Sequence, residues 1–316
     1  MLDRIPRTVV HYGLLDPREH RGGVETFARN LAQVFENVLF MTPQSQDLPL
    51  VRREGWLVIC DNQHCLDWPP DMPVVGFQHG FALRKAWALR RRGDLGLALR
   101  QARAARRPNT LWVADAEWVQ RSFGRWFGNR ARHLVLHAVN LAQFDGRLDN
   151  DGSKLILHDG RTPHKGSALY PILQREMPHL RFEGLNCPPD QVADRMRGAA
   201  AFLHLSRYEG NSLVCNEAMA MNLPCLFTRV GLFLDGGEPF DVDTVSVKEA
   251  FTQPRRLEEK LRALLAKGAR TPRRWVEAHA SVAANRAAWG RVVDDFRRSF
   301  GDLSQTNRPG KREGVT

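Results

Sequence analysis

Two glutamates stand eight positions apart, Glu209 and Glu217, on either side of a short Gly/Asn/Ser turn. The first follows an apolar run at 201–205, and the second falls in the opening turns of a predicted helix. Each carboxylate can accept two strong hydrogen bonds, which suits sugar hydroxyls. The free backbone N–H groups and the positive dipole end of the helix attract an anion to the same turn. The pattern therefore predicts a phosphorylated sugar ligand.

A second turn with charged side chains, 159–166, follows another predicted strand. Arg161 and Lys165 in this turn could both face one diphosphate. A guanidinium can bind two oxygens at once, whereas an ammonium is a compact point charge. A solvated basic turn is the alternative, but the position directly after a strand favours a binding role.

Two further turns have side chains or backbone suited to a ligand. Gly22 and Gly23 lie between the first predicted strand and helix, where a backbone can approach an anion closely. His79 and Gly80 end the fourth predicted strand, so the imidazole could point into a cleft. The alternative for Gly22 and Gly23 is an ordinary glycine-rich turn, and the alternative for His79 is a structural histidine. No Gly-x-Gly-x-x-Gly motif occurs, which argues against a nicotinamide enzyme.

Short apolar runs alternate with helical patterns along nearly the whole chain, which predicts parallel sheets covered on both faces. In the first half we expect strands at 8–12, 38–41, 56–60, 74–78, 111–114 and 134–139, and helices at 25–35 and 117–127. In the second half we expect strands at 155–158, 181–183, 201–205, 225–228 and 244–247. Helices are expected there at 166–175, 191–197, 214–221, 255–266 and 274–300, the last with a break near its middle.

The polar stretch 145–153 is rich in turn residues and predicts a domain linker. We expect two Rossmann-like, doubly wound α/β domains, 1–145 and 146–300, that face each other across a cleft. Ligands of such sheets bind at the carboxyl ends of the strands, where the strand order reverses. The tail 301–316 is rich in glycine and charge, which predicts disorder.

The composition narrows the classes of protein. The net charge of +11 favours an anionic partner, and the five scattered cysteines indicate a reducing compartment. No His-Glu-x-x-His motif and no Cys-x-x-Cys pair occurs, and we expect neither a metal nor a cofactor. No signal peptide or membrane span is visible. We therefore expect a soluble, cytoplasmic protein, and a peripheral contact with the inner face of the membrane stays open.

The segment Arg84 to Arg107 carries nine basic residues against Asp94 alone, with leucines and Trp87 between them. This composition is typical of a helix that lies on anionic lipid. It equally fits a solvated helix that uses one apolar stripe for its core. A nucleic-acid partner is not expected, because no module of stacking aromatic residues accompanies the charge.

Taken in chain order, these motifs resemble the retaining nucleotide-sugar glycosyltransferases of family four, which have the two-domain GT-B fold. Gly22-Gly23-Val24-Glu25, His79-Gly80, Gly160-Arg161 with Lys165-Gly166, and Glu209 with Glu217-Ala218-Met219-Ala220 carry the resemblance, which spans most of the chain. Asn211 replaces the aromatic residue that usually follows the first glutamate, and Asn222 replaces the glycine that commonly ends the helix.

The resemblance implies a role for each motif residue. Glu217 would hold the ribose of the donor, while Glu209 with the Gly210 and Asn211 backbone would hold the transferred hexose. Arg161 and Lys165 would neutralise the diphosphate without a metal. The N–H groups of Ser212, Leu213 and Val214 would meet phosphate, Gly22 and Gly23 would close on it, and His79 would lie near the reactive end of the sugar.

The sequence thus predicts transfer of a hexose from a nucleoside diphosphate sugar to a saccharide or lipid-linked acceptor, with retention, in cell-surface polysaccharide or glycolipid synthesis. Two alternatives stay open. A nucleotide-sugar epimerase of the same fold would transfer nothing to an acceptor. A catalytically idle protein would bind nucleotide or glycan in the same cleft.

Overall fold

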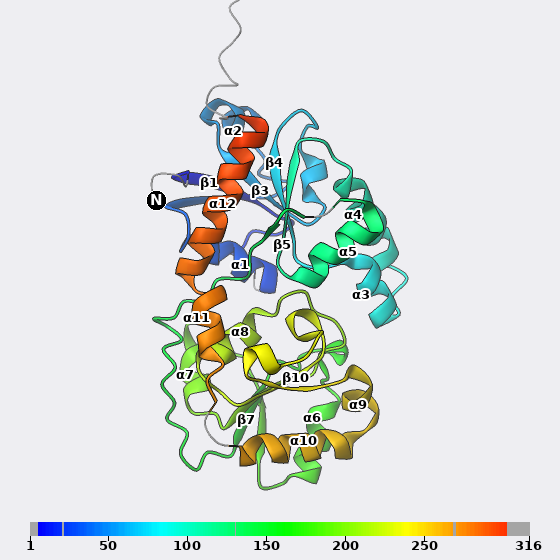
Figure 1. Cartoon of the computed structure of the whole chain (residues 1–316), viewed down its shortest axis with the longest axis vertical. Helices are drawn as coiled ribbons and strands as arrows, with labels where there is room; N and C mark the ends of the chain where they lie inside the picture. Colours follow the sequence, from blue (N-terminus) through cyan, green and yellow to red (C-terminus); the bar gives the residue numbers. More distant parts are fainter. Residues whose placement is uncertain (1–5, 21, 130, 268–269, 302–316) are drawn as a thin grey trace, which may run out of the picture.

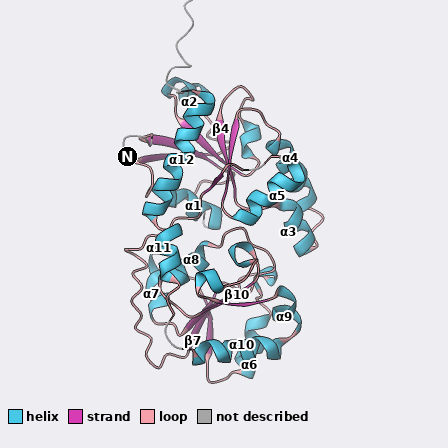
Figure 2. Ribbon diagram, in the orientation of Figure 1, coloured by secondary structure: helices cyan, strands magenta, loops and turns pink. Residues whose placement is uncertain are grey.

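The computed structural model describes residues 6–20, 22–129, 131–267 and 270–301, which form two parallel sheets stacked end to end in two domains (Figure 1). The first sheet has six strands in the order β2-β1-β3-β4-β5-β6, and the second has five in the order β11-β10-β9-β7-β8. All strand pairs are parallel. Helices cover both faces of each sheet (Figure 2). The predicted pair of Rossmann-like domains is confirmed.

The strands of the first domain are β1 Thr8–Tyr12, β2 Asn37–Met41, β3 Leu57–Asp61, β4 Val74–Gln78, β5 Thr110–Ala114 and β6 His133–Leu134. Its helices are α1 Gly23–Leu31, α2 Leu48–Glu54, α3 Ala82–Leu89, α4 Asp94–Ala105 and α5 Glu117–Phe127. Strands β3 and β4 are buried at every position, which explains their unbroken apolar runs, because helices cover both faces of the sheet.

The strands of the second domain are β7 Leu155–His158, β8 Arg181–Gly184, β9 Ala201–His204, β10 Cys225–Thr228 and β11 Asp243–Val245. Its helices are α6 Leu169–Glu176, α7 Val192–Arg197, α8 Leu213–Ala220, α9 Val247–Thr252, α10 Pro254–Ala266 and α11 Arg273–His279. A 3₁₀ turn, η3 Pro163–Lys165, follows β7. The predicted linker at 145–153 lies between the last strand of the first sheet and the first strand of the second.

The last helix, α12 Val282–Phe300, returns to the first domain (Figure 1). Its Trp289 is fully buried and belongs to the same core cluster as Phe27 of α1 and Val75 of β4. The break from α11 occurs at Ser281, whose hydroxyl accepts the N–H of Ala284 at 3.2 Å and so begins a new helix. The predicted interruption of the helix at 274–300 is confirmed.

Several predicted elements were wrong in extent, and the helix expected at 25–35 ends at Leu31. The basic segment Arg84 to Arg107 is two helices, α3 and α4, since Arg90 leaves the helix in the left-handed region at φ 53°. The strand expected at 134–139 ends at Leu134 and leaves only one bridge, from Val139 to Ser281. The helix expected from Gly166 begins at Leu169, because Gly166 has a positive φ of 74° that closes the η3 turn.

Asn222 has a φ of 58°, so the residue that replaces the usual glycine after α8 does adopt left-handed geometry. No helix within the described part of the chain is both long and apolar enough to cross a bilayer.

Candidate functional site

The strand order reverses between β1 and β3 in the first sheet and between β7 and β9 in the second. Polar side chains gather at the carboxyl ends of these strands in both domains. A cavity of about 410 Å³ lies between the two groups and takes lining residues from both domains. Its lining includes Gly22, Gly23, His137, Asp159, Arg161, Lys165, Glu209, Asn211, Ser212, Leu213, Val214 and Glu217.

Helix α8 begins at this cavity. Ser212 is its N-cap but makes no side-chain cap bond, and within the described chain the N–H groups of Leu213 and Val214 have no hydrogen-bond acceptor. These free donors and the helix dipole make the turn a site for an anion. Because the cavity lies directly over this turn, the structure brings the predicted phosphate donors to it.

Glu217 lies in the second turn of α8 and also lines the cavity. Burial raises the pKa of this carboxyl to about 8, and no cation or N–H donor offsets the effect. In the described chain its oxygens have no hydrogen-bond partner from another residue. A ligand with neighbouring hydroxyls would provide the missing donors, so the geometry suits the predicted contact with ribose.

Glu209 and Lys165 belong to a closed ring of four charged side chains, which we call the C-side ring: Asp159, Lys165, His204 and Glu209. Lys165 Nζ donates to Asp159 Oδ2 at 2.9 Å and lies 3.2 Å from Glu209 Oε1. His204 Nδ1 lies 2.8 Å from Asp159 Oδ1, and its Nε2 lies 3.4 Å from Glu209 Oε1. Two acids therefore alternate with two bases around the ring.

Asp159 and His204 are buried, and Lys165 and Glu209 are partly exposed, yet the groups of the C-side ring are held in their charged forms. Burial opposes the charge on Asp159, but His204 and Lys165 outweigh it, so the pKa of this carboxyl lies below its ordinary range. Burial likewise opposes the charges on Lys165 and His204, but their carboxylate neighbours raise the pKa of both. The pKa of Glu209 is lowered, since Lys165 and His204 overcome the effect of its burial. The ring is thus a balanced set of two positive and two negative charges.

Arg161 lies apart from the C-side ring. Its side chain is exposed at the cavity, and its guanidinium forms no hydrogen bond or ion pair with any described residue. The two predicted diphosphate cations therefore differ, because Lys165 is held by two carboxylates while Arg161 is available to a ligand.

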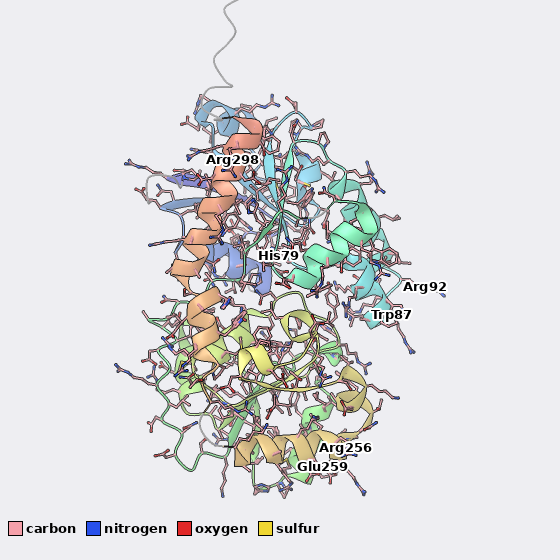
Figure 3. The ribbon with its side chains drawn as sticks, viewed as in Figure 1. His79, Trp87, Arg92, Arg256, Glu259 and Arg298 are labelled. Carbon is pink, nitrogen blue, oxygen red and sulfur yellow. The ribbon has the colours of Figure 1, made fainter. Side chains whose placement is uncertain are left out.

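In the first domain, His79 follows the last residue of β4 and lies at the domain boundary (Figure 3). Its Nε2 is 2.8 Å from Asp61 Oδ1, and Asp61 Oδ2 is 3.1 Å from His11 Nε2. Burial would lower the pKa of His79, but the charge of Asp61 outweighs it and raises the pKa. The protonated ring then bonds Asp61 through Nε2 and leaves Nδ1–H without a partner in the described chain.

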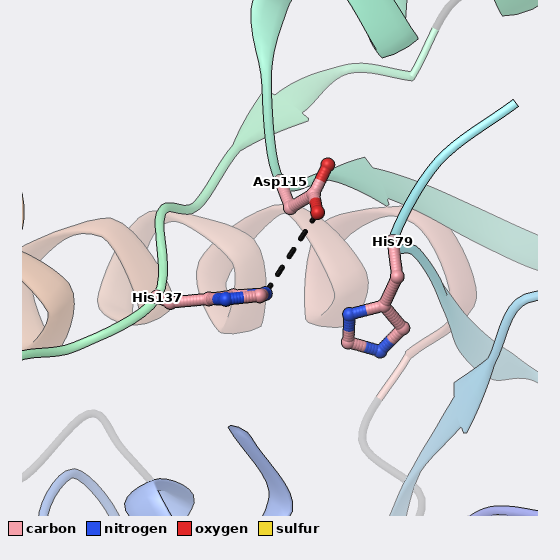
Figure 4. Close-up of side chains that lie close together, drawn as sticks. All are labelled: His79, Asp115 and His137. Carbon is pink, nitrogen blue, oxygen red and sulfur yellow. Dashed lines mark ion pairs between the residues drawn. The ribbon is translucent and has the colours of Figure 1, made fainter. Parts of the chain in front are cut away.

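Asp115 and His137 lie beside His79 (Figure 4), and we call Asp61, His11, His79, Asp115 and His137 the N-side cluster. His137 Nε2 is 3.8 Å from Asp115 Oδ2. Burial raises the pKa of Asp115 to about 7, and burial lowers the pKa of His137 to about 3. Several atoms of this cluster, including both ring nitrogens of His137, have no hydrogen-bond partner in the described chain.

One potential ligand atom from each of His79, Asp115 and His137 lies within 4.8 Å of the others, a grouping that could also hold a cation. The spacing His133-x-x-x-His137 and the pairs Asp149/Asp151 and Asp241/Asp243 are also typical of metal ligands. However, His133 Nε2 lies 2.9 Å from Asp295 Oδ2, and Arg270 donates to Asp241 Oδ1 at 2.9 Å. These two residues therefore already have other partners. That the site needs no metal stays a prediction.

The turn that carries Glu209 is fixed to the first domain. The Tyr208 hydroxyl accepts the N–H of Phe81 at 2.7 Å, and Trp118 Nε1–H donates to the Gly210 carbonyl at 3.2 Å. A Cβ on Gly210 would lie 1.9 Å from the His79 carbonyl oxygen, so only glycine fits there. Glu209 is therefore held in place by both domains.

The backbone of Asn211 is not free to bind sugar in this structure. Its N–H donates to Asp115 Oδ2 at 3.1 Å, and its side-chain amide donates to the Asp115 carbonyl at 3.2 Å. The role of this N–H in holding the hexose stays a prediction, and it would require the bond to Asp115 in the opposite domain to break.

Gly22 and Gly23 are exposed at the start of α1, on the first-domain side of the cavity. Gly22 has extended backbone, and a Cβ there would come within 2.2 Å of a Glu25 carboxylate oxygen. A Cβ on Gly23 would meet no atom of the described chain within 4 Å, so the backbone at this position stays open to a ligand.

Sequence reasoning missed Asp61, Asp115, Asp159, His204 and His137. A signal was present for the first four, since each ends or directly follows a strand whose other residues are almost all apolar. A polar side chain at the carboxyl end of a parallel strand points to the binding edge of the sheet. His137 lies in an irregular segment, and its position follows only from the folded structure.

The second half of the chain is similar in sequence to a known family. Residues 163–281 match the sequence profile of a family described as glycosyl transferases group 1. That segment contains Lys165, Glu209 and Glu217. No curated protein sequence matches the chain.

Several solved structures share the fold. HepE from Anabaena, solved in complex with UDP, has 14% identity and a TM-score of 0.66 over 91% of this chain and 100% of its own. Sucrose-phosphate synthase from Thermosynechococcus elongatus has 15% identity and a TM-score of 0.70 over 93% and 100%. WaaG, a glycosyltransferase involved in lipopolysaccharide biosynthesis, has 14% identity and a TM-score of 0.59 over 92% and 99%. The chain therefore has the GT-B fold of glycosyltransferases.

Proposed function

We propose that this protein is a glycosyltransferase that moves a hexose from a nucleoside diphosphate sugar to a saccharide or lipid-linked acceptor, with retention of anomeric configuration. The observation that carries the proposal is the cavity between the domains, where the open N-terminus of α8, an unpaired arginine and an unpartnered glutamate face one space. The matched family and the UDP and UDP-glucose bound by HepE support it.

The donor fits this cavity by charge and by hydrogen bonding. Its diphosphate would lie against the N–H groups of Leu213 and Val214 and the side chain of Arg161, and its ribose would donate to Glu217. The hexose would lie between Glu209 and His79, which approach the site from opposite domains. Every contact uses a group that has no other partner or that the C-side ring holds in place.

The reaction breaks the bond between the anomeric carbon and the diphosphate oxygen, and the electron pair leaves with the diphosphate. Arg161, Lys165 and the α8 dipole stabilise this developing charge. The acceptor oxygen then bonds to the anomeric carbon from the same face, and its proton passes to the departing phosphate oxygen. Protonated His79 donates Nδ1–H to the sugar instead of acting as a base. We infer that no metal is needed.

We further propose a role in cell-surface polysaccharide or glycolipid synthesis at the inner face of the membrane. Trp87 is 83% exposed and Leu99 is 70% exposed, and both lie within the basic segment Arg84 to Arg107. Apolar side chains among arginines suit contact with anionic lipid. Binding to vesicles with and without anionic lipid tests this point, and equal binding to both would contradict it.

The direct test of the function is product analysis with a panel of nucleoside diphosphate sugars, with and without acceptors, for the wild type and Glu209→Gln. We expect transfer with retention for one donor and a loss of about 100-fold in the variant. Epimerised donor without acceptor would favour the epimerase. Donor binding without turnover would favour a nucleotide-binding protein, and unchanged turnover in the variant would refute the role of Glu209.

A further inference from the structure

A second cavity, of about 660 Å³, opens at the outer edge of the domain boundary. One wall is the C-terminal end of α3 and the turn after it, with Trp87, Arg90 and Arg91. The other wall belongs to the second domain and includes His164 of the η3 turn and Arg207. The cavity therefore joins the two domains on the side away from α12.

The charge of this cavity is of one sign. Three arginines line it, and none of its described lining residues is acidic. The guanidinium groups of Arg90, Arg91 and Arg207 form no ion pair with any described residue, although Arg207 lies 4.0 Å over the ring of Phe251. Three uncompensated guanidinium groups around one space attract an anion of more than one charge.

Two arginines on the surface of α10 are paired with acids and serve for comparison. On α10, Arg256 donates to Glu259 at 3.0 Å, and both side chains face solvent (Figure 3). Arg262 donates to Glu258 at 2.9 Å on the same helix. Around the second cavity, by contrast, none of the described lining residues is an acid that could pair with the three arginines.

The turn that presents these arginines is strained. Arg90 ends α3 with a φ of 53°, a left-handed conformation that glycine or asparagine adopts more readily. This conformation directs the chain so that Arg90 and Arg91 both line the cavity. Residues in such conformations cluster at active sites and ligand-binding sites.

The second cavity continues into the reaction site. It shares Leu89 and His164 with a smaller cavity of about 270 Å³. That smaller cavity is lined by His79, Lys165 and Glu209 together with polar side chains of the first domain. A molecule whose anionic group lies on the arginines could therefore extend a hydroxyl to the transferred sugar.

We propose that the acceptor is a phosphorylated saccharide, whose phosphate is bound by Arg90, Arg91 and Arg207 while its sugar ring stacks on exposed Trp87. This inference rests on the proposed transferase function and names the acceptor class. A phosphate carries nearly two negative charges and three acceptor oxygens, which match three guanidinium groups better than a single carboxylate does. The phosphate belongs either to a free sugar phosphate or to a lipid-linked sugar diphosphate.

The test measures binding by calorimetry on the full chain, with the donor site saturated by the nucleoside diphosphate that it binds. The probes are glucose, glucose 6-phosphate, glucuronic acid, and glucose linked to a polyprenyl diphosphate in detergent. We expect a phosphorylated probe to bind about 10-fold or more tightly than glucose and glucuronic acid. The stronger of the two phosphorylated probes identifies the source of the phosphate.

The double variant Arg91→Ala/Arg207→Ala is expected to lose this preference, while Arg207→Lys keeps part of it and Arg256→Ala keeps all of it. The variants should retain wild-type affinity for the nucleoside diphosphate, which shows that they fold. Equal binding of glucose and both phosphorylated probes would overturn the inference, as would a preference for glucuronic acid. If no nucleoside diphosphate binds, the transferase proposal fails by itself, and the phosphate preference is measured on the ligand-free protein.

Discussion

The C-side ring and the N-side cluster approach the domain boundary from opposite domains, but their charged groups are paired differently. In the ring, two carboxylates meet two bases at 2.8 to 3.4 Å, and each group is close to two others. His204 Nε2 and Glu209 Oε1 make no hydrogen bond among the described residues, but each lies in an ion pair of the ring. In the cluster, two carboxylates meet three histidines, and His137 and one nitrogen of His79 have no hydrogen-bond partner in the described chain.

This difference indicates different roles for the C-side ring and the N-side cluster. A balanced ring keeps Lys165 and Glu209 charged and fixed before the substrate arrives, so little reorganisation is needed when the diphosphate leaves. Unpaired buried groups are costly in the free protein, and a ligand with hydroxyls would satisfy them. We therefore expect changes in the C-side ring to alter mainly the rate of transfer. Changes in the N-side cluster should alter mainly ligand binding and the pH dependence of stability.

The largest effect is expected from Lys165→Ala, which removes the cation that joins the ring to the diphosphate. Loss of one preorganised charge that stabilises a leaving group lowers kcat by about 100- to 1,000-fold. Steady-state transfer rates measure it. Lys267→Ala is the matched control, because Lys267 binds Asp243 at 2.6 Å on the surface. A loss below about 5-fold would show that the ring does not take part in transfer.

Asp159→Asn is expected to have the next largest effect on kcat. Asp159 is proposed to position the bases of the ring and not to contact the substrate. Asp159 holds both bases of the ring, so we expect kcat to fall about 10-fold with little change in the KM of the donor. His204, which also faces Glu209 and Cys215, loses the carboxylate that raises its pKa. The imidazole then becomes neutral as pH rises, and the defect grows with pH.

The pH profile of kcat for Asp159→Asn and wild type distinguishes this role from a structural one. Asp243→Asn, at the exposed Lys267 and Arg270 pairs, is the control. A defect of equal size from about pH 6 to about pH 9 would contradict the role of Asp159 in charging His204.

Glu217→Gln is expected to raise the KM of the donor about 10-fold, because the amide offers one acceptor oxygen where the carboxylate, charged once the ribose hydroxyls donate to it, offers two. The same change should stabilise the ligand-free protein at high pH. Burial raises the pKa of Glu217 to about 8 in the folded state, so the wild type loses stability as pH rises from about 4.5 to about 8.

Thermal unfolding across pH tests this sign. The variant should exceed the wild type by about 2 kcal/mol near pH 9, allowing for partial exposure of the carboxyl, and the difference should vanish near pH 4. A variant that is less stable than the wild type near pH 9 would show that the charged carboxylate is satisfied in the free protein.

The smallest effect is expected from Asp115→Asn in the N-side cluster. The amide oxygen still accepts the Asn211 N–H, so transfer should change less than about 3-fold. The carboxyl has a pKa of about 7, and the wild type should lose stability relative to the variant as pH rises from about 4 to about 7. Abolished activity in the variant, together with inhibition by EDTA, would instead identify a metal at His79, Asp115 and His137.

The sequence was sufficient for much of the fold because its strands are short, Val-rich and buried on both faces. It also located Glu209, Glu217, Arg161 and Lys165, since these follow strands or begin a helix. It could not show that Lys165 is bound by Asp159 while Arg161 is not, because both cations lie in the same turn and their spacing does not distinguish them. The break after Leu89 was missed, since Arg90 is not a residue typical of left-handed backbone.

The contact of Asn211 with the other domain was not predicted for a similar reason. The turn was predicted to present its backbone to a sugar, but Asp115 of the other domain accepts its N–H at 3.1 Å. Contacts between domains join residues far apart in the chain, and no local spacing predicts them.

The central claim is that the cavity between the domains binds a nucleoside diphosphate through the α8 N-terminus, Arg161 and the C-side ring. Calorimetric titration of nucleoside diphosphates into the wild type, Arg161→Ala and Arg256→Ala tests it most directly. We predict micromolar binding of at least one diphosphate, a loss of about 10-fold or more in Arg161→Ala and no change in Arg256→Ala. Absence of binding at millimolar concentration for every diphosphate, or equal affinity in Arg161→Ala, would contradict the claim.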